Sequence, residues 1–389
     1  MLKRIVNLFT SLKLTVTCLT FGMLLIFVGT LAQVDEGLYN AQARYFKSWL
    51  IWAPTLLGHK VPIVLPGGYL LGGVLLVNLL AAHAQRFTLS KKKIGIFMVH
   101  SGLILLLLGQ LLTDVLSIES AMRIPPGEPV NYSQDFHANE LVVIDTSPAS
   151  NDEVVSIPES LAAKQSEIRH EKLPVVLRVK NYWANADWVK GPANGAVATT
   201  ANQGTGQGVY VLPRPPVLTM EERNLPSAEV EVMTPQGGSL GTWLLSSQPW
   251  VPSSPFAAKQ TFTHANKVYQ LALRFTRHYK PYTITLQKFT HEKYKGTDIP
   301  KNFSSRIRLQ NPATGEDQEH LIFMNEPLRY AGETFYQGSF EKGDIVSILQ
   351  VVHNPGWLTP YFACVLMALG LIVQFMSHLI GFAKKRRTA

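Results

Sequence analysis

The residue with the clearest chemical potential is His100, which lies within a strongly apolar stretch of the sequence. The stretch IGIFMVHSGLILLLLGQLL follows three consecutive lysines, and His100 is seven residues past the last of them, Lys93. A neutral imidazole can ligate a metal, relay a proton or hydrogen-bond a neighbouring helix. Because ionisable side chains are rare inside membranes and usually functional there, the meaning of His100 depends on whether this stretch spans a bilayer.

Four stretches are long and apolar enough to cross a membrane, which takes roughly 20 residues in a helix. We predict helices over about residues 14–33, 67–84 and 94–114, and a fourth at the start of the C-terminal segment 357–389. The apolar runs within these segments, Leu14–Ala32, Gly67–Ala84, Ile94–Leu112 and Leu358–Phe382, contain no Asp, Glu, Lys or Arg, which is unusual for soluble helices of this length. The alternative for the first run, a cleaved signal peptide, is disfavoured because the run is long for that role.

The positive charge of the chain predicts how these helices are oriented. The formal net charge is +9, and many cations lie in short segments beside the predicted helices. These are Lys3, Arg4 and Lys13, then Arg86 and Lys91 to Lys93, and finally Lys384 to Arg387. Short loops rich in Lys and Arg stay on the cytoplasmic side. Both termini should therefore be cytoplasmic, and the charge indicates membrane topology rather than nucleic-acid binding.

Residues 117–356 should form a large extracytoplasmic domain between the third and fourth helices. They contain short β-branched or aromatic runs, such as VVLRVKNYW and YTITLQKFT, separated by Pro, Gly, Asn and Asp. This spacing is typical of an antiparallel sandwich or open barrel. The polar stretch 190–208 is expected to be a mobile loop. The predicted fold class is membrane α plus β, with the N-terminal membrane region covering residues 1–116.

Glycine and aromatic residues suggest two further features of the membrane region. Within the segment 39–60, YFKSWLIW is expected to form a short helix lying in the membrane interface. Gly68 and Gly72 either allow close helix packing or reflect how common glycine is in membrane helices.

The two cysteines, Cys18 and Cys364, fall within the predicted first and fourth helices. No C-x-x-C or C-x-x-C-H motif is present, so the chain offers neither a redox dithiol nor an attachment site for c-type haem. The extracytoplasmic domain has no cysteine and must be held together by its core. No nucleophile elbow, phosphate-binding loop or carboxylate cluster indicates a catalytic site.

The other histidines are weaker candidates than His100. His83 and His378 lie near basic clusters at the cytoplasmic ends of helices two and four, where an interfacial position is favoured over ligation. His353 precedes helix four and could contact a group at the outer membrane face, although a solvated loop histidine is the simpler interpretation. On the residues alone, His100 remains either a ligand or a partner in an interhelical hydrogen bond.

Several segments resemble the ResB/CcsB family of cytochrome c biogenesis proteins. Near the N-terminus these are SLKLTVTCLTFGMLLIFVGTLAQ, PGGYLLGGVLLVNLLAAH and HSGLILLLLG. Near the C-terminus they are YKGTDIPKNFSSRIRL, FMNEPLRYAGETFYQGSF and LQVVHNPGWLTPY, which form the most specific part. The resemblance does not extend over residues of about 150–265.

The resemblance implies a subunit of a membrane cytochrome c synthase. In that family the B subunit acts with a partner called CcsA or ResC, carries haem b across the membrane and delivers it to apocytochrome c. A histidine of the third helix ligates the haem iron opposite a histidine of the partner, and His100 is at the matching position. Because thioether formation needs reduced thiols, a thioredoxin-like reductant is implied indirectly.

The chain departs from the partner's pattern because it has no tryptophan-rich haem-holding segment. The resemblance therefore implies an unfused B subunit of the bacterial cytoplasmic (inner) membrane, inactive alone and part of a holocytochrome c synthase. The alternative is a non-catalytic scaffold that binds apocytochrome c or stabilises the partner without ligating haem. A third reading, a membrane-tethered sensor or assembly factor, is disfavoured by the complete C-terminal series. Within that series, Tyr330, Tyr336 and Gln337 are expected to be core and sheet positions rather than substrate contacts.

Overall fold

A computed structural model describes residues 2–388 except 57, 87–92, 149–150, 165, 218–222, 248–258, 297–299 and 342–344. The chain divides into two compact units, a helical unit and a β-rich unit. The helical unit contains Met1–Ile118 and His353–Ala389, and the β-rich unit contains Glu119–Val217 and Glu221–Val352.

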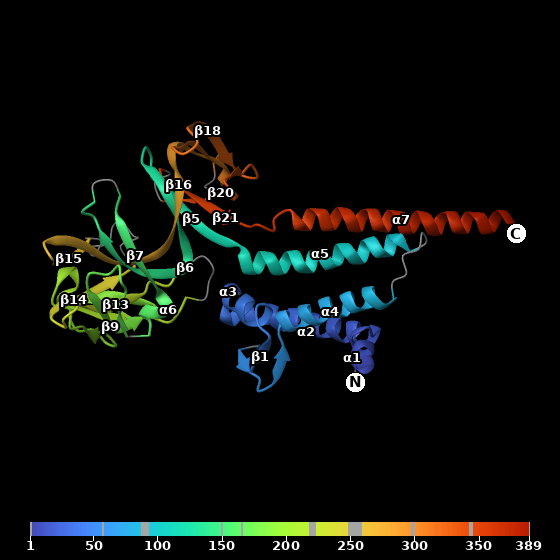
Figure 1. The fold of residues 1–389 in the computed structure, drawn as a ribbon, viewed down its shortest axis with the longest axis horizontal. Helices are drawn as coiled ribbons and strands as arrows, with labels where there is room; N and C mark the ends of the chain where they lie inside the picture. Colours follow the sequence, from blue (N-terminus) through green and yellow to red (C-terminus); the bar gives the residue numbers. More distant parts are fainter. Residues whose placement is uncertain are drawn as a thin grey trace. The chain divides into compact units, whose positions relative to one another are not determined.

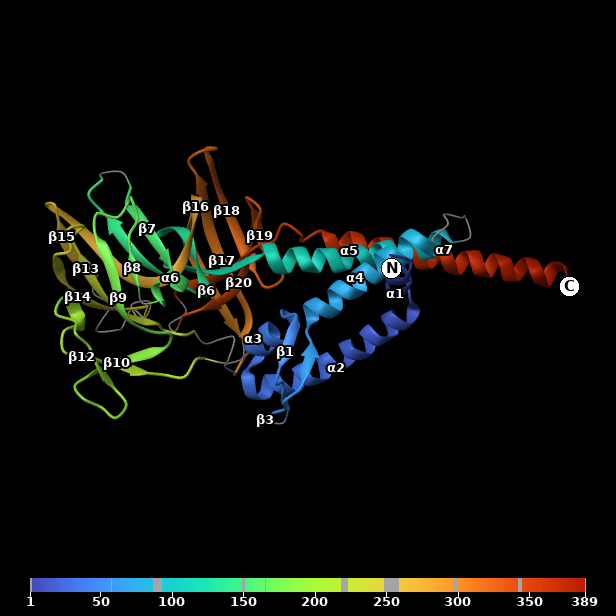
Figure 2. The same cartoon turned by 60° about the horizontal axis from the view of Figure 1, so that its bottom comes forward.

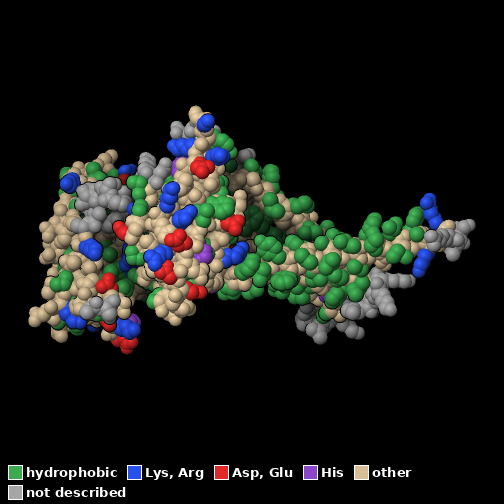
Figure 3. Space-filling model, turned by 90° about the horizontal axis from the view of Figure 1, so that it is seen from above, with side chains coloured by type: hydrophobic (Ala, Val, Ile, Leu, Met, Phe, Trp, Pro, Cys, Tyr) green, Lys and Arg blue, Asp and Glu red, His purple; other side chains and the backbone are tan. Residues whose placement is uncertain are grey.

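Four long helices of the helical unit are apolar enough to span a membrane (Figure 1). They are α2 (Leu12–Glu36), α4 (Gly68–Arg86), α5 (Ile94–Leu116) and α7 (Thr359–Thr388), and a short helix α1 (Leu2–Phe9) precedes them. Figure 3 shows hydrophobic side chains covering most of the helical surface seen in that view. Phe27, Leu111 and Phe375 are examples of large apolar side chains that are exposed on these helices. Surfaces of this kind belong in lipid, so the chain is a membrane protein. The predicted fold class, three N-terminal helices and one C-terminal helix around a β-rich domain, is confirmed.

The connection between α2 and α4 differs from the predicted interfacial helix. It consists of α3 (Leu38–Ala41), the π-helical turn η1 (Gln42–Phe46), and strands β1 (Leu50–Trp52), β2 (Thr55–Leu56), β3 (His59–Lys60) and β4 (Val64–Pro66). The helical part of YFKSWLIW ends at Phe46, and β1 pairs antiparallel with β4. In β1, Ile51 is buried while Leu50 and Trp52 are exposed, which is the two-residue alternation of a strand.

The β-rich unit is built mainly from a ten-stranded and a four-stranded sheet (Figures 1 and 2). The larger sheet has the order β18-β17-β16-β6-β5-β21-β20-β19, with β15 on β16 and β7 on β6, and the smaller has the order β14-β13-β9-β8. The larger sheet comprises β5 (Ile118–Ile124), β6 (Pro129–Asp145), β7 (Glu153–Pro158), β15 (Gln260–His264), β16 (Lys267–Lys293), β17 (Pro300–Asn311), β18 (Glu316–Phe323), β19 (Leu328–Tyr330), β20 (Glu333–Phe340) and β21 (Ser347–His353). The smaller sheet comprises β8 (Glu167–Ile168), β9 (Val176–Trp183), β13 (Ser227–Met233) and β14 (Ser239–Ser246).

A third sheet, β10-β12-β11, has three strands. Its strands are β10 (Ala186–Lys190), β11 (Val197–Ala198) and β12 (Val209–Pro213), and the short helices α6 (Glu159–Ala162) and η2 (Gly204–Gly206) complete the unit.

Two hydrophobic cores share the long strands β6 and β16. In the first core, Leu141 of β6 and Leu271 of β16 pack with residues of the four-stranded sheet such as Val230. In the second, other residues of β6 and β16 pack with β17, β20 and β21, for example Ile307 and Phe335. The first core lies between two sheets, as in a sandwich.

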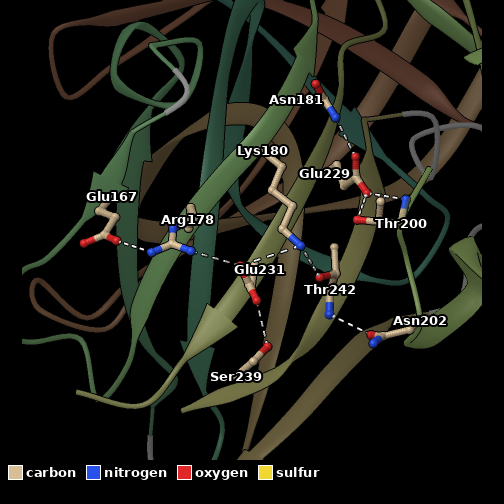
Figure 4. A network of polar contacts seen from close by, with 10 residues as sticks. All are labelled: Glu167, Arg178, Lys180, Asn181, Thr200, Asn202, Glu229, Glu231, Ser239 and Thr242. Atoms are coloured by element: carbon tan, nitrogen blue, oxygen red, sulfur yellow. Dashed lines mark hydrogen bonds and ion pairs between the residues drawn. The ribbon is translucent and has the colours of Figure 1, made fainter. Parts of the chain in front are cut away.

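The stretch 190–208 is ordered, contrary to the prediction of a mobile loop. The carboxylate of Glu229 in β13 is fully buried and accepts hydrogen bonds from the backbone N–H and the hydroxyl of Thr200, each at 2.5 Å. It also accepts one from the Asn181 side chain at 2.7 Å (Figure 4). The side chain of Asn202 accepts a hydrogen bond from the backbone N–H of Thr242 at 2.8 Å. These contacts explain why a stretch with few apolar residues is nevertheless held in place.

Candidate functional site: two histidines on α4 and α5

One side of α5 is occupied by close packing against α7. Gly95, Gly102 and Gly109, spaced seven residues apart, are buried on this side. A Cβ atom added to Gly95 would lie 2.6 Å from the carbonyl oxygen of Gly370, and one on Gly102 would lie 2.9 Å from that of Ala363. Only glycine permits this approach of two backbones. We refer to these three residues as the glycine face of α5.

His100 projects from the other side of α5. At about 100° per residue, His100 lies roughly 160° around the helix from Gly102. Its neighbour there is α4, because the ring of His83 lies 5.5 Å from that of His100, centroid to centroid, at an interplanar angle of 57°. The ring of Phe97, one turn earlier on α5, lies 5.1 Å from His83. The structure thus brings His83 and His100 together, and we call them the histidine pair.

The pairing of His83 with His100 was missed by the sequence interpretation, which favoured an interfacial position for His83. A signal was nevertheless present. Both histidines lie within about two turns of the short connection between the second and third predicted helices, so an antiparallel arrangement places them at similar depth. Sequence spacing alone does not state that the two rings face each other.

A buried polar contact positions α4 for this pairing. Asn78 lies five residues before His83 and is almost fully buried. Its side-chain amide donates to the carbonyl oxygen of Phe9 at 2.7 Å and accepts from the hydroxyl of Thr15 on α2 at the same distance. Because an unpaired amide in an apolar environment is costly, these bonds fix α4 relative to α1 and α2.

An ion pair secures the other end of α5. The carboxylate of Asp114 is largely buried and lies 2.6 Å from the ammonium of Lys47, and it also accepts a hydrogen bond from the hydroxyl of Tyr69. Asn354, which precedes α7, donates to the hydroxyl of Thr113 at 3.3 Å. These contacts and the glycine face hold α5 at both ends, so the position of His100 is determined by the fold.

The geometry of the pair limits the ways in which it could bind haem iron. A metal–imidazole bond is about 2.0 Å, so two rings on opposite sides of one iron have centroids roughly 6 Å apart with the macrocycle between them. The rings of His83 and His100, whose centroids lie 5.5 Å apart, are closer together than this. With the rings this close, the pair leaves no room for a macrocycle between the two histidines. Across the described residues, no cluster of three or more His, Cys, Asp or Glu side chains could hold a metal ion.

The remaining sequence candidates are not part of the pair. His378 lies on α7 and is 2.8 Å from the side-chain nitrogen of Gln374, one turn earlier. His353 is the last residue of β21. Gly68 packs closely, since an added Cβ would lie 2.3 Å from the carbonyl oxygen of Phe46, whereas a Cβ on Gly72 would meet nothing within 4 Å. The two glycines do not act together as a packing motif.

The residues singled out in the C-terminal series lie on strands of the β-rich unit. Tyr330 in β19 accepts a hydrogen bond from Asn311 at 2.8 Å and packs edge-on against Tyr282. The side-chain oxygen of Gln337 in β20 accepts a hydrogen bond from the hydroxyl of Ser305 at 2.6 Å. Tyr336 points outward and is 38% exposed. Tyr330 and Gln337 therefore have structural partners, and Tyr336 is a surface position.

Comparison with known proteins finds a family match in this part of the chain. Residues 241–348, from β14 into β21, match the model of the ResB-like family. Over these residues the resemblance to the ResB/CcsB family is confirmed. Protein NrfI from Wolinella succinogenes is 32% identical to the chain over 92 residues, which amount to 24% of this chain and 10% of NrfI. The match thus spans about a tenth of that relative's length.

Proposed function

We propose that the chain is a subunit of a membrane cytochrome c synthase that helps carry haem across the membrane and deliver it to apocytochrome c. It would act with a CcsA/ResC-type partner, as the resemblance implies. The observation that carries this proposal is the position of His100, within an apolar helix and on the side that does not pack against α7. An imidazole within the membrane can contact a substrate held between helices.

In this proposal, residues of α4 and α5 have separate roles in holding haem. His100 would bind haem iron, the transported substrate, through an unprotonated ring nitrogen. His83 would orient the ring of His100 by contact, and Phe97 would hold the ring of His83. The partner would supply the opposite ligand, since His83 does not lie across an iron from His100. On α4, a Cβ on Gly72 or Gly73 would meet nothing within 4 Å, so a neighbouring chain could approach this helix closely.

The chemistry of thioether formation assigns further roles to other proteins. The thiols of apocytochrome c must be reduced before haem attachment, and this chain's cysteines, Cys18 in α2 and Cys364 in α7, do not form a dithiol. A thioredoxin-like reductant would therefore act on apocytochrome c. The β-rich unit, on the outer side of the bacterial inner membrane, would receive that substrate.

One observation favours the scaffold alternative. The family match covers residues 241–348, which lie in the β-rich unit and include neither α4 nor α5. A scaffold that binds apocytochrome c or stabilises the partner needs that unit but no haem ligand. The haem-carrying function and the scaffold function therefore differ in one testable point, which is whether His100 is a ligand of the haem iron.

The decisive experiment is absorption spectroscopy of the complex co-expressed with its CcsA/ResC partner. We expect His100→Ala to lose most of the bound haem or to shift the Soret and α bands, because one axial ligand is removed. Adding imidazole to His100→Gly should restore the native spectrum, since a soluble ligand can occupy the vacated position.

The control is His378→Ala, which removes a histidine of α7 that lies beside Gln374 on the same helix. Its haem content and spectrum should match those of the unchanged complex. Native haem content and bands in His100→Ala would exclude haem ligation by His100 and leave the scaffold function.

A further inference from the structure

The β-rich unit contains a large cavity that the proposed haem path does not use. Its volume is about 970 Å³, and its lining comes from strands β5, β6, β7, β10, β14, β15 and β16 together with neighbouring residues. Cavities of this size hold substantial ligands. Four cations line it: Arg123, Lys259, Arg274 and Arg277.

Two of these arginines are neutralised by carboxylates. Arg123 forms two hydrogen bonds with Glu341, at 2.5 and 2.8 Å, and Arg274 donates to Glu140 at 2.8 Å. Arg277 is different: among the described residues it has no hydrogen bond or ion pair, and its Nε is buried without an acceptor. A buried guanidinium N–H without an acceptor is energetically costly, so Arg277 is the lining residue most in need of an anionic partner.

The backbone and an aromatic ring hold Arg277 in this position. Arg277 lies directly after an irregularity in the pairing of β16 with β6, where Phe275 pairs with Asn139 but Arg277 pairs with Gln134. Residues 135–138 of β6 bulge out at this point, and Asp135 accepts hydrogen bonds from the N–H groups of His137 and Ala138 at 2.8 Å. Bulges of this kind re-aim side chains beside binding sites.

The guanidinium of Arg277 also lies over the ring of Tyr132, 4.0 Å from its centroid. Stacking of this kind leaves the edge of the guanidinium available for a planar, bidentate contact with a carboxylate. Arg277 is therefore oriented before any ligand arrives.

The rest of the lining suits a polypeptide. Side-chain amides from several strands border the cavity, including Asn131, Gln134 and Gln270, and β14 is an edge strand of its sheet. Ser247, which follows β14, is 2% exposed, and its hydroxyl has no hydrogen-bond partner among the described residues. Dispersed donors and acceptors of this kind match the alternating N–H and C=O groups of an extended chain.

From these contacts we propose that the cavity binds an extended peptide segment bearing an acidic side chain, whose carboxylate pairs with Arg277. Assigning this peptide to apocytochrome c rests on the proposed function, whereas the preference for a carboxylate does not. The peptide experiment measures anion binding in the β-rich unit, whereas the haem spectrum reports on His100. The peptide-binding proposal can therefore fail without the haem proposal, and the reverse is also true.

The experiment uses the full-length protein in detergent and two short fluorescein-labelled peptides of alternating Thr and Tyr. The peptides differ only in one central residue, Glu or Gln, and binding is followed by fluorescence anisotropy. The unchanged protein should bind the Glu peptide about tenfold more tightly, the size of effect expected for a charge-assisted hydrogen bond. Arg277→Gln should remove this preference, and Arg277→Lys should retain part of it because the charge remains without the planar fork.

Arg308→Gln is the matched control, since Arg308 lies on β17, pairs with Asp317 and does not line the cavity. It should keep the tenfold preference. Equal affinity of the unchanged protein for the two peptides would overturn the proposal, even if Arg277→Gln failed to fold. A preference that survives in Arg277→Gln would overturn it as well.

Discussion

Single buried residues determine whether polar segments of this protein are ordered. Glu229 is the clearest example, because its carboxylate is fully buried and joins β9, β13 and the stretch 190–208. Nearby Glu167 is half-exposed and forms an ion pair with Arg178 at 2.5 Å (Figure 4). The two carboxylates have similar numbers of partners but very different access to water.

Replacing Glu229 should therefore cost much more than replacing Glu167. In Glu229→Ala the hydrogen bonds from Thr200 and Asn181 to a fully buried carboxylate are lost, and we expect a loss of about 1.5–3 kcal/mol in the free energy of unfolding. We expect rapid proteolytic cleavage within 190–208 in the same variant. Glu167→Ala should change stability by less than about 1 kcal/mol, since its ion pair is solvated. Chemical unfolding and limited proteolysis of the full-length protein measure both effects, and similar losses in the two variants would contradict this account.

At the scale of whole elements, helix packing in the membrane depends on where small residues lie. Gly102 lies against the backbone of α7, where an added Cβ would be 2.9 Å from the carbonyl oxygen of Ala363. Gly72 on α4 has no such neighbour within 4 Å. The same substitution should thus have opposite consequences at the two positions.

We expect Gly102→Ala to destabilise the contact between α5 and α7 by about 1–3 kcal/mol, the typical cost of overpacking. Gly72→Ala should be tolerated or slightly stabilising, because alanine is the better helix former. The temperature at which each detergent-solubilised variant loses its monodisperse peak in size-exclusion chromatography measures the difference. Equal melting of Gly102→Ala and the unchanged protein would show that the glycine face is not a close contact.

The features of this fold that depend on local sequence could be predicted, whereas those that depend on contacts between distant segments could not. The four helices were predictable because an uninterrupted apolar run of this length has few stable alternatives to a membrane span. The strand Leu50–Trp52 was not predictable, because it forms by pairing with a separate segment, Val64–Pro66. The proximity of His83 to His100 likewise depends on the tertiary packing of α4 against α5. The ordered conformation of residues 190–208 depends on Glu229, which is distant in the sequence. His100 was identifiable because one ionisable residue in an apolar run is already unusual.

At the scale of the whole molecule, the distribution of charge predicts which parts face which side of the membrane. Basic residues cluster at both termini and in the segment between α4 and α5, and short basic segments stay cytoplasmic. The β-rich unit should therefore lie outside. The native cysteines, in α2 and α7, leave the β-rich unit free of thiols for a labelling experiment.

We expect Lys190→Cys, at an exposed position of the β-rich unit, to react in intact cells with a maleimide that cannot cross membranes. Arg386→Cys, in the last turn of α7, should react only after the cells are permeabilised. The unchanged protein reports the background from Cys18 and Cys364. Labelling of Arg386→Cys in intact cells would reverse the predicted orientation.

The glycine face of α5 also has a consequence for how the protein is made. Its partner α7 begins at Thr359, and the ribosome adds about 250 residues between Gly109 and that position at roughly 5–20 residues per second. For tens of seconds during synthesis, a nascent chain would hold the long apolar helices α2, α4 and α5 and a growing β-rich unit while α7 does not yet exist. Throughout that time a strip of bare backbone on α5 would be open to lipid, to the insertion machinery or to another subunit. Assembly with a partner subunit could therefore begin before α7 packs against the glycine face of α5.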